Sequence, residues 1–232
     1  MVDRPAAAGF VVHEVAGLRL RAPDVELGRP SVFAHLWPAG VVLAEYVAGA
    51  LATTLAGRRV LELGCGLGAA GLAAARHGAD VVLSDAADAA LALAESNAHA
   101  NRLTVEVVRL RWGRLPAALA GRFDVVLGAD VTYDARERRR LLATIEAALA
   151  PGGTAWLADP GRTSRRELEH HTALAVEPWA RFPPRAGLVT GEGNEDRNVV
   201  LYRLTSATGS SSVTAPEAAS AGARAARRGS AR

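Results

Sequence analysis

The sequence predicts an α/β fold with a doubly wound, mostly parallel sheet of seven strands whose last strand is antiparallel. Short apolar runs alternate with segments of helical spacing along the chain, as expected for parallel strands joined by crossover helices. A run of strand composition at 60–63 leads directly into a glycine turn, and helical composition follows to His77. With 232 residues, half of them apolar, the chain can bury one core of this size.

Apolar runs and capping signals locate each element of the domain. Asp134 with Glu137 and Ser164 with Glu167 have the spacing of capping boxes, so each pair predicts a helix start. Helices are expected at 41–55, 69–77 and 86–101, from Asp134 to about 149, and from Ser164 to about 171. Strands are expected at 60–63, 80–84, 104–110, 123–128, 154–158, 173–180 and 198–204.

The chain is expected to divide into three parts. Residues 1–30 form an N-terminal hairpin or edge extension, because residues 10–21 alternate around Gly17. Residues 31–205 form the domain itself. Residues 206–232 are mainly Ala, Ser, Gly and Arg with almost no large apolar side chain, so we expect a disordered tail there.

The positive charge of the chain is concentrated in that last segment. The whole chain has a formal net charge of +3, and the stretch from Ser206 onward holds four arginines against one glutamate. The remainder is therefore formally neutral and lacks the surplus of basic residues that a nucleic-acid-binding face needs. We expect no nucleic acid on the folded domain.

Residue types that are missing exclude several kinds of site. All 27 basic residues are arginines, which excludes a G-K-[ST] phosphate loop, a lysine Schiff base and a Tyr-x-x-x-Lys dehydrogenase pair. Cys65 is the single cysteine, so no intrachain disulfide or cysteine-based zinc site can form. Adjacent His170 and His171 point to different sides of a helix, and no metal is expected. Without a signal peptide or apolar span, a cytoplasmic monomer away from membranes is the expectation.

The turn after the first strand of the domain has the composition of a cofactor cradle. Gly64, Gly66 and Gly68 lack a Cβ, so a ligand can approach the backbone closely. Asp85 ends the next strand, where a βαβ nucleotide site places the acidic partner of the ribose hydroxyls. Glu62 inside the first strand would repel a pyrophosphate and suits a positively charged ligand such as S-adenosylmethionine.

Together, Glu62-x-Gly64-x-Gly66-x-Gly68 and Asp85 resemble the first two motifs of class I S-adenosylmethionine-dependent methyltransferases. The resemblance implies a Rossmann-like fold, S-adenosylmethionine as cofactor and S-adenosylhomocysteine as product. Two alternatives remain on the residues alone. One is a nicotinamide oxidoreductase, because the glycines also fit G-x-G-x-x-G, and the other is a non-catalytic relative that binds a partner.

Two further segments resemble the small seven-strand protein lysine methyltransferases. The L-W-P-A-G segment at 36–40 matches theirs, which implies that Trp37 lines the cofactor pocket. Asp130-x-x-Tyr133 matches their signature beside the methyl acceptor, which implies catalytic roles for Asp130 and Tyr133. Ala129 stands at the same strand end, where ligands collect in an open α/β sheet, and is assigned to the cofactor. A loop aspartate that satisfies nearby amides is the alternative for Asp130.

The resemblance continues at Trp112, which it implies as a wall for the adenine. Arg111 departs from the pattern, because the relatives usually have an acidic residue before this tryptophan. Asp159-Pro160-Gly161-Arg162 resembles a loop of the electron-transfer-flavoprotein lysine methyltransferases, which implies substrate-binding roles for Asp159 and Arg162. A salt bridge within the loop is the alternative.

The sequence therefore predicts an S-adenosylmethionine-dependent methyltransferase that N-methylates a lysine side chain of a protein substrate. A small-molecule N-methyltransferase, of the nicotinamide or amine type, shares the early motifs and remains an alternative.

Overall fold

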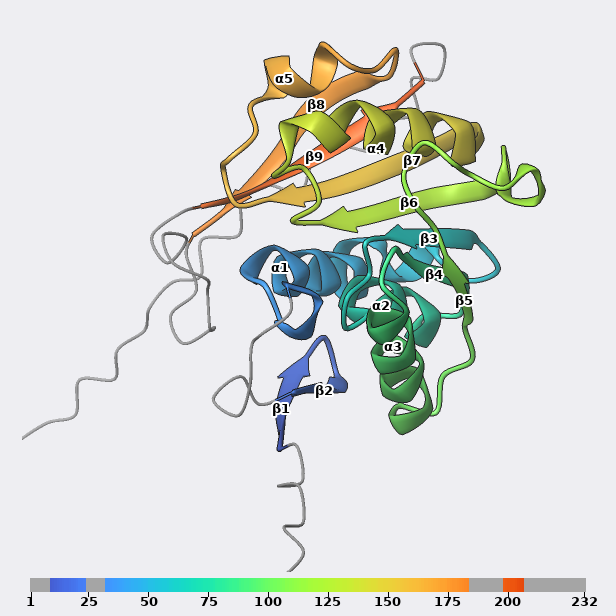
Figure 1. The fold of residues 1–232 in the computed structure, drawn as a ribbon, viewed down its shortest axis with the longest axis vertical. Helices are drawn as coiled ribbons and strands as arrows, with labels where there is room; N and C mark the ends of the chain where they lie inside the picture. The colour runs from blue at the N-terminus through green and yellow to red at the C-terminus, as the bar shows by residue number, and fades with distance from the viewer. Residues whose placement is uncertain (1–8, 24–31, 184–197, 207–232) are drawn as a thin grey trace, which may run out of the picture.

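The computed structural model describes residues 9–23, 32–183 and 198–206. Seven strands form one sheet in the order β5-β4-β3-β6-β7-β9-β8 (Figure 1). The first five of these strands are mutually parallel, and β9 runs antiparallel to both of its neighbours. The predicted fold, including the antiparallel last strand, is confirmed. The strands are β3 Arg59–Leu63, β4 Asp80–Asp85, β5 Glu106–Arg109, β6 Phe123–Ala129, β7 Leu149–Asp159, β8 Ala175–Phe182 and β9 Val199–Thr205.

Helices cover both faces of this sheet, so each face has its own core (Figure 1). Helices α1, α2 and α3 pack their apolar residues on one face, and α4 and α5 pack theirs on the other. Central strand β3 is buried on both faces, since Val60 belongs to the first core and Leu61 to the second. The helices are α1 Pro38–Tyr46, α2 Ala69–Arg76, α3 Asp88–Ala100, α4 Ala135–Ala148 and α5 Arg165–Glu169.

The helix expected at 41–55 is shorter than predicted. Helix α1 ends at Tyr46 and continues as a π-helical turn at Val47–Leu51 and a 3₁₀ turn at Ala52–Thr54. Gly49 lies in the π-helical turn, where it lowers the helix propensity of this stretch. The Thr54 hydroxyl then donates to the Leu51 carbonyl (2.8 Å) and stabilises the tighter turn.

The N-terminal hairpin is present as a separate two-stranded sheet of β1 Phe10–Val15 and β2 Leu18–Pro23. Two asparagines of α3 hold it against the domain. The Asn97 side chain accepts from the Arg21 N–H (2.8 Å) and donates to the Arg21 carbonyl (3.2 Å). Asn101 bonds the N–H and carbonyl of Arg19 in the same way, at 2.9 Å each. Residues 1–8 and 24–30 of the predicted extension, and residues 207–232 of the predicted tail, lie outside the described residues.

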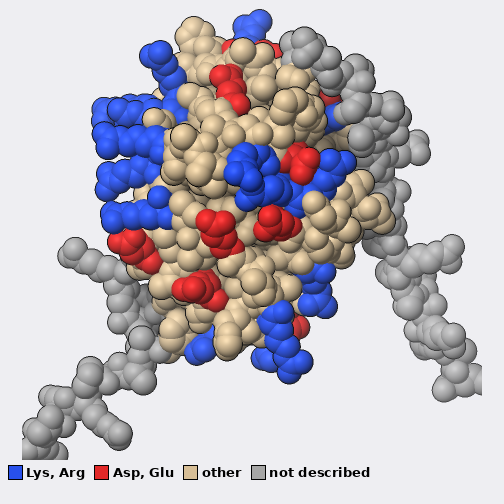
Figure 2. Space-filling model, turned by 90° about the vertical axis from the view of Figure 1, so that its right-hand side faces the viewer, with Lys and Arg blue, Asp and Glu red and all other residues tan. Residues whose placement is uncertain are grey.

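The edge of the sheet at which the parallel strands begin carries charges of both signs. Basic and acidic side chains are interspersed over the centre of this side of the molecule (Figure 2). Arg58 pairs with Asp124 (3.0 Å) and Arg59 with Asp80 (3.2 Å) at these strand starts. Within the described part of the chain, no helix has both the length and the apolar character needed to cross a membrane.

Candidate active site

A cavity of about 740 Å³ opens at the other edge, where the parallel strands end. Its walls come from the segments that follow β3, β4, β5 and β6, and from the segment before α1. This is the edge at which open α/β sheets bind ligands. Of the predicted site residues, the cavity is lined by Trp37, Glu62, Gly64, Gly66, Asp85, Trp112, Ala129, Asp130 and Tyr133.

The floor of the cavity is the turn after β3, and two of its glycines are required there. Gly64 has φ +65° and Gly66 has φ +50°, a conformation that side chains rarely adopt. A Cβ on Gly64 would lie 2.8 Å from Cγ1 of Val131, and one on Gly66 would lie 3.2 Å from the Phe33 carbonyl oxygen. The chain therefore presents bare backbone to the cavity, as the sequence predicted for a cofactor cradle.

Gly68, which was predicted to bind the cofactor, packs against neighbouring elements. It precedes α2 with φ +80° and does not line the cavity. A Cβ at this position would meet Leu83, Leu72 and Ala94, at 3.2 to 3.4 Å. Gly68 therefore allows α2 to pack closely on β4 and α3.

Asp85 lies beside the glycine turn at the end of β4. Its carboxylate accepts hydrogen bonds from the N–H of Gly66 (3.2 Å) and from the N–H of Ala87 (3.0 Å). These two bonds fix the carboxylate at the cavity wall, and each oxygen keeps a further lone pair for a ligand hydroxyl. This geometry fits the predicted ribose partner.

Glu62 is a buried acid on the cavity wall, with only 3% of its surface exposed. Its Oε2 accepts from the Gly71 N–H at 2.8 Å. Burial raises the pKa of Glu62 to about 8; the N–H groups of Gly71 and Ala70 act against this rise, and nearby Asp85 adds to it. A cationic ligand in the cavity would stabilise the ionised form of this carboxylate.

Aromatic side chains line the cavity from two distant parts of the chain. Trp37 precedes the first residue of α1, and its ring centroid lies 5.3 Å from that of His35. Trp112 follows β5 and packs over Gly64. Both tryptophans thus lie where a nucleoside between the segments following β3, β4 and β5 would contact them.

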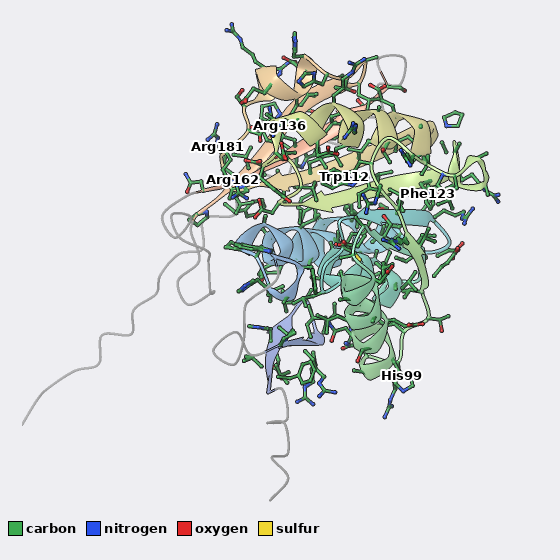
Figure 3. All side chains as sticks on the ribbon, viewed as in Figure 1. His99, Trp112, Phe123, Arg136, Arg162 and Arg181 are labelled. Carbon is green, nitrogen blue, oxygen red and sulfur yellow. The ribbon has the colours of Figure 1, made fainter. Side chains whose placement is uncertain are left out.

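Asp130 stands at the end of β6 in a left-handed conformation (φ +56°), and its N–H donates to the Ala158 carbonyl (2.8 Å). Only 7% of its side chain is exposed, and its Oδ1 forms an ion pair with the guanidinium of Arg162. The same guanidinium lies 5.9 Å from the ring centroid of Tyr133, which is 55% exposed. Figure 3 shows Arg162 at the end of the sheet where β6 and β7 finish, opposite Phe123, the first residue of β6.

Asp159 does not reach the cavity, contrary to the substrate-binding role expected for it. The residue is fully buried, and both carboxylate oxygens are engaged. One accepts from the Thr132 hydroxyl, and the other from the N–H groups of Arg162 (2.6 Å) and Thr163 (3.0 Å). Asp159 therefore ties the loop after β7 to the loop after β6.

Buried Arg138 of α4 completes this link. Its guanidinium donates to the Thr132 carbonyl (3.1 Å) and pairs with Glu167 (3.2 Å). The Ser164–Glu167 capping box is present. The Asp134 cap also forms, through the Arg136 N–H (2.8 Å), but Glu137 pairs with Arg140 (2.6 Å) instead of closing a box.

Comparison with known proteins shows the family to which this chain belongs. The family model described as lysine methyltransferase matches residues 19–171. The chain belongs to the lysine methyltransferase family. Membership confirms two expectations drawn from the glycine motif, namely the class I methyltransferase fold and an S-adenosylmethionine-dependent methyltransferase.

Several relatives of this methyltransferase are known by function. EEF1A lysine methyltransferase 3 of Mus musculus is 33% identical over 180 residues, which cover 75% of this chain and 73% of that protein. Protein N-lysine methyltransferase METTL21A of Danio rerio is 37% identical over 51% of this chain and 56% of that protein. Histone-arginine methyltransferase METTL23 of Xenopus laevis is 35% identical over 48% of this chain and 49% of that protein. The methyltransferase thus spans about half the length of these last two relatives.

Solved structures share the fold of the methyltransferase at low sequence identity. The Thermus thermophilus 16S rRNA N2 G1207 methyltransferase RsmC, in complex with AdoMet and guanosine, superposes with a TM-score of 0.62 at 21% identity. It covers 87% of this chain, and this chain covers 51% of it. SMU.776, in complex with SAH, gives a TM-score of 0.58 at 12% identity, with coverages of 88% and 58%.

Sequence reasoning missed several residues of the methyltransferase cavity. Phe33 and His35 lie in or next to a 3₁₀ turn that closes over the glycine turn, and Arg114 and Arg140 lie at its mouth. None of them belongs to a motif with recognisable spacing, so only the packing of the segments brings them together. Among the described residues, no group of three His, Cys, Asp or Glu side chains could hold a metal ion.

Proposed function

We propose that this methyltransferase transfers the methyl group of S-adenosylmethionine to the side-chain amine of a lysine in a protein. The observation that carries the proposal is the buried carboxylate of Asp130 on the wall of the cofactor cavity, beside exposed Tyr133. Two relatives named as lysine methyltransferases support the acceptor class. Asp130 supplies the negative charge that an incoming ammonium group needs.

The proposed cofactor contacts follow from the cavity walls. Backbone groups of Gly64 and Gly66 form the cradle, and Asp85 binds the ribose hydroxyls. Glu62 faces the positive end of the cofactor. Contacts with the adenosine come from Trp37, Trp112 and Ala129. The bound cofactor supplies an electrophilic methyl group on a sulfonium, and S-adenosylhomocysteine is the product.

The methyltransferase itself has to orient the acceptor and remove its proton. A free lysine amine has a pKa near 10.4, so it arrives protonated and cannot attack until it loses a proton. Transfer into a cavity walled by tryptophans lowers that pKa, because burial disfavours the charged form. Asp130 captures and orients the ammonium, and it favours the charged form, so it acts as an orienting group and not as a strong base. The proton then leaves to solvent past exposed Tyr133.

An arginine acceptor is the second candidate. A relative named as a histone-arginine methyltransferase supports it, and so does the ion pair in which Asp130 already holds the guanidinium of Arg162. A lysine has an advantage because its free electron pair attacks directly after deprotonation, whereas a guanidinium must first lose its resonance stabilisation.

One experiment separates these acceptors. The protein is incubated with radiolabelled S-adenosylmethionine in a lysate of its source, and labelled protein is separated from labelled small molecules. Hydrolysis of the labelled protein then gives methyllysine or methylarginine. Methyllysine, strongly reduced when Asp130 is replaced by Asn, is the expected result. Label in small molecules alone would instead support the small-molecule N-methyltransferase.

Location and assembly are part of the same proposal. We infer a cytoplasmic monomer, and the free, buried thiol of Cys65 is consistent with a reducing compartment. Cell fractionation and light scattering of the purified protein test these two statements.

A further inference from the structure

Five arginines lie on two segments at one wall of the cofactor cavity. Arg111 and Arg114 follow β5, and Arg136, Arg139 and Arg140 belong to the first half of α4. Three of them, Arg111, Arg114 and Arg140, line the cavity itself. Arg136 is one helical turn before Arg140 on the same face of α4, and Arg139 is next to it. We call these five residues the arginine rim.

The two parts of the arginine rim are in direct contact, so they form one surface. The Gly113 N–H donates to the hydroxyl of Thr144 in α4 at 2.7 Å. A Cβ on Gly113, which has φ +80°, would lie 3.3 Å from Cγ of Arg140. The loop between Arg111 and Arg114 therefore lies directly on the arginine-bearing face of α4.

Most of this positive charge has no carboxylate partner among the residues that the structure describes. Within the described residues, Arg140 pairs with Glu137, while Arg111, Arg114, Arg136 and Arg139 form no ion pair. Exposed arginines elsewhere often do pair, as with Arg165 and Glu169 (2.7 Å). In Figure 2 a row of basic side chains projects from the side of the molecule that faces the viewer in Figure 1, the side on which α4 lies. Such a cluster repels itself and attracts anions.

Acidic side chains line the same cavity at the ends of the parallel strands. Glu62, Asp85 and Asp130 line it, and the described residues place no arginine among these three except Arg162 beside Asp130. A ligand that fits both regions carries a cation at its centre and anions beside it. A target lysine with neighbouring aspartate or glutamate residues has this arrangement. A phosphate chain fits less well, because the carboxylates inside the mouth would repel it.

We propose that the arginine rim docks an acidic segment of the protein acceptor next to its target lysine. This rests on the proposed function, since it describes the acceptor of that same site. Exposed ion pairs each contribute little, so the rim raises affinity by a few-fold per arginine and steers association more than it holds the complex.

Binding of two fluorescent peptides tests this proposal without requiring methyl transfer. Both carry one central lysine, flanked by glutamates in one peptide and by serines in the other. Anisotropy is measured with S-adenosylhomocysteine present. The test variant is Arg136→Gln with Arg139→Gln, two rim residues outside the cavity wall. The control is Arg122→Gln with Arg166→Gln, two exposed arginines that form no ion pair in the described structure and belong to neither segment of the arginine rim.

The expected result is tighter binding of the glutamate peptide to the natural protein, with the preference weakening as salt is added. The rim variant should lose about tenfold in affinity for that peptide and keep its affinity for the serine peptide, while the control keeps both. Equal binding of the two peptides, or an equal loss in the control, would overturn the proposal. Tighter binding of oligouridine than of the glutamate peptide, at the same ionic strength, would also overturn it and favour a nucleic acid. The binding experiment measures no methyl transfer. If the acceptor is not lysine, this would therefore appear in the labelling experiment and not here.

Discussion

The carboxylate of Asp130 and the guanidinium of Arg162 form an ion pair between the loops that follow two adjacent parallel strands, β6 and β7. Oδ1 of Asp130 is buried against Arg162, while Asp130 also lines the cavity. One side of the carboxylate is thus held by the protein, and Asp130 also lines the cavity that we propose the methyl acceptor enters. Arg162 was predicted to bind substrate; because it pairs with Asp130, we propose instead that it positions this carboxylate.

Replacing Asp130 by Asn tests the role of the charge. The amide keeps the shape and one accepting oxygen but removes the negative charge that holds an ammonium group. We expect kcat/KM for methyl transfer to fall roughly a hundredfold, on the order of 3 kcal/mol, with cofactor affinity nearly unchanged. Single-turnover transfer and calorimetric titration measure the two quantities. Loss of cofactor binding would assign Asp130 to the nucleoside pocket, and an unchanged rate would leave it a structural loop residue.

Replacing Arg162 by Gln tests its positioning role. The change leaves the Asp130 carboxylate buried without its charged partner, so we expect a loss of about 1 to 3 kcal/mol in the free energy of unfolding, together with slower transfer. In a double-mutant cycle the effects of Asp130→Asn and Arg162→Gln on kcat should not add, because both act on the same carboxylate. Arg166→Gln, on an exposed face of α5, is the control. Additive effects would show that the two residues act independently.

Asp85→Ala should weaken S-adenosylmethionine binding by about 1 to 3 kcal/mol, because the ribose loses a charged acceptor. The N–H groups of Gly66 and Ala87 lose their partner in the same variant, so a small drop in melting temperature should accompany the loss. Calorimetry against Asp88→Ala, an exposed acid paired with Arg109, gives a matched comparison. Equal cofactor affinity in the two variants would remove Asp85 from the site.

Glu62 should make the stability of the ligand-free protein depend on pH. Burial raises the pKa of Glu62 from 4.5 to about 8, so the folded state holds this proton more tightly than the unfolded state does. Its contribution to stability is therefore complete below about pH 4.5 and is lost as pH rises toward 8. Melting temperatures across this range should fall in the natural protein, and Glu62→Gln should remove this part of the decline. If the melting temperature of Glu62→Gln falls with pH as steeply as that of the natural protein, Glu62 is not the group responsible.

The affinity for the cofactor should also depend on the ionisation of Glu62, and it should rise with pH where the stability falls. A positive ligand beside Glu62 favours the ionised carboxylate, so binding below about pH 8 must release a proton and affinity must rise with pH. The cofactor's own amino group titrates near pH 8, and it does so with the natural protein and with Glu62→Gln alike. The difference between the natural protein and Glu62→Gln therefore isolates the carboxylate. Titration in buffers of different ionisation enthalpy measures the released proton directly.

Asn97→Ala should destabilise the protein by about 2 to 3 kcal/mol, because it leaves buried backbone groups without partners. Asn97 is fully buried and bonds Arg21 twice and the Leu67 carbonyl once (3.1 Å). Asn101→Ala removes similar bonds at an exposed position and should cost about 1 kcal/mol or less. Denaturant unfolding compares the two. Equal effects would mean that solvent replaces the Asn97 bonds, and that the hairpin is held by its apolar contacts alone.

The sequence by itself determined the order of the elements and the part of the cavity formed by the glycine turn and Asp85. Gly64, Gly66 and Asp85 could be placed because strand, turn and helix are local, and the pairing of β3 with β4 follows from one crossover connection. The ends of elements were less well determined. Helix α1 stopped early at a glycine-containing stretch, and β7 began at Leu149 instead of Thr154.

Only the tertiary structure decided which side chains lie together around Asp130. Asp130 and Arg162 meet because β6 and β7 are neighbours that end at the same edge, and their separation in sequence carries no signal of this contact. Asp159 was predicted to bind substrate, yet it is fully buried and accepts a hydrogen bond from Thr132 of the opposite loop. The arginine rim likewise depends on the packing of the loop after β5 against α4. Local patterns encode periodicity and turns, whereas contacts between distant loops depend on how strands pair and helices pack.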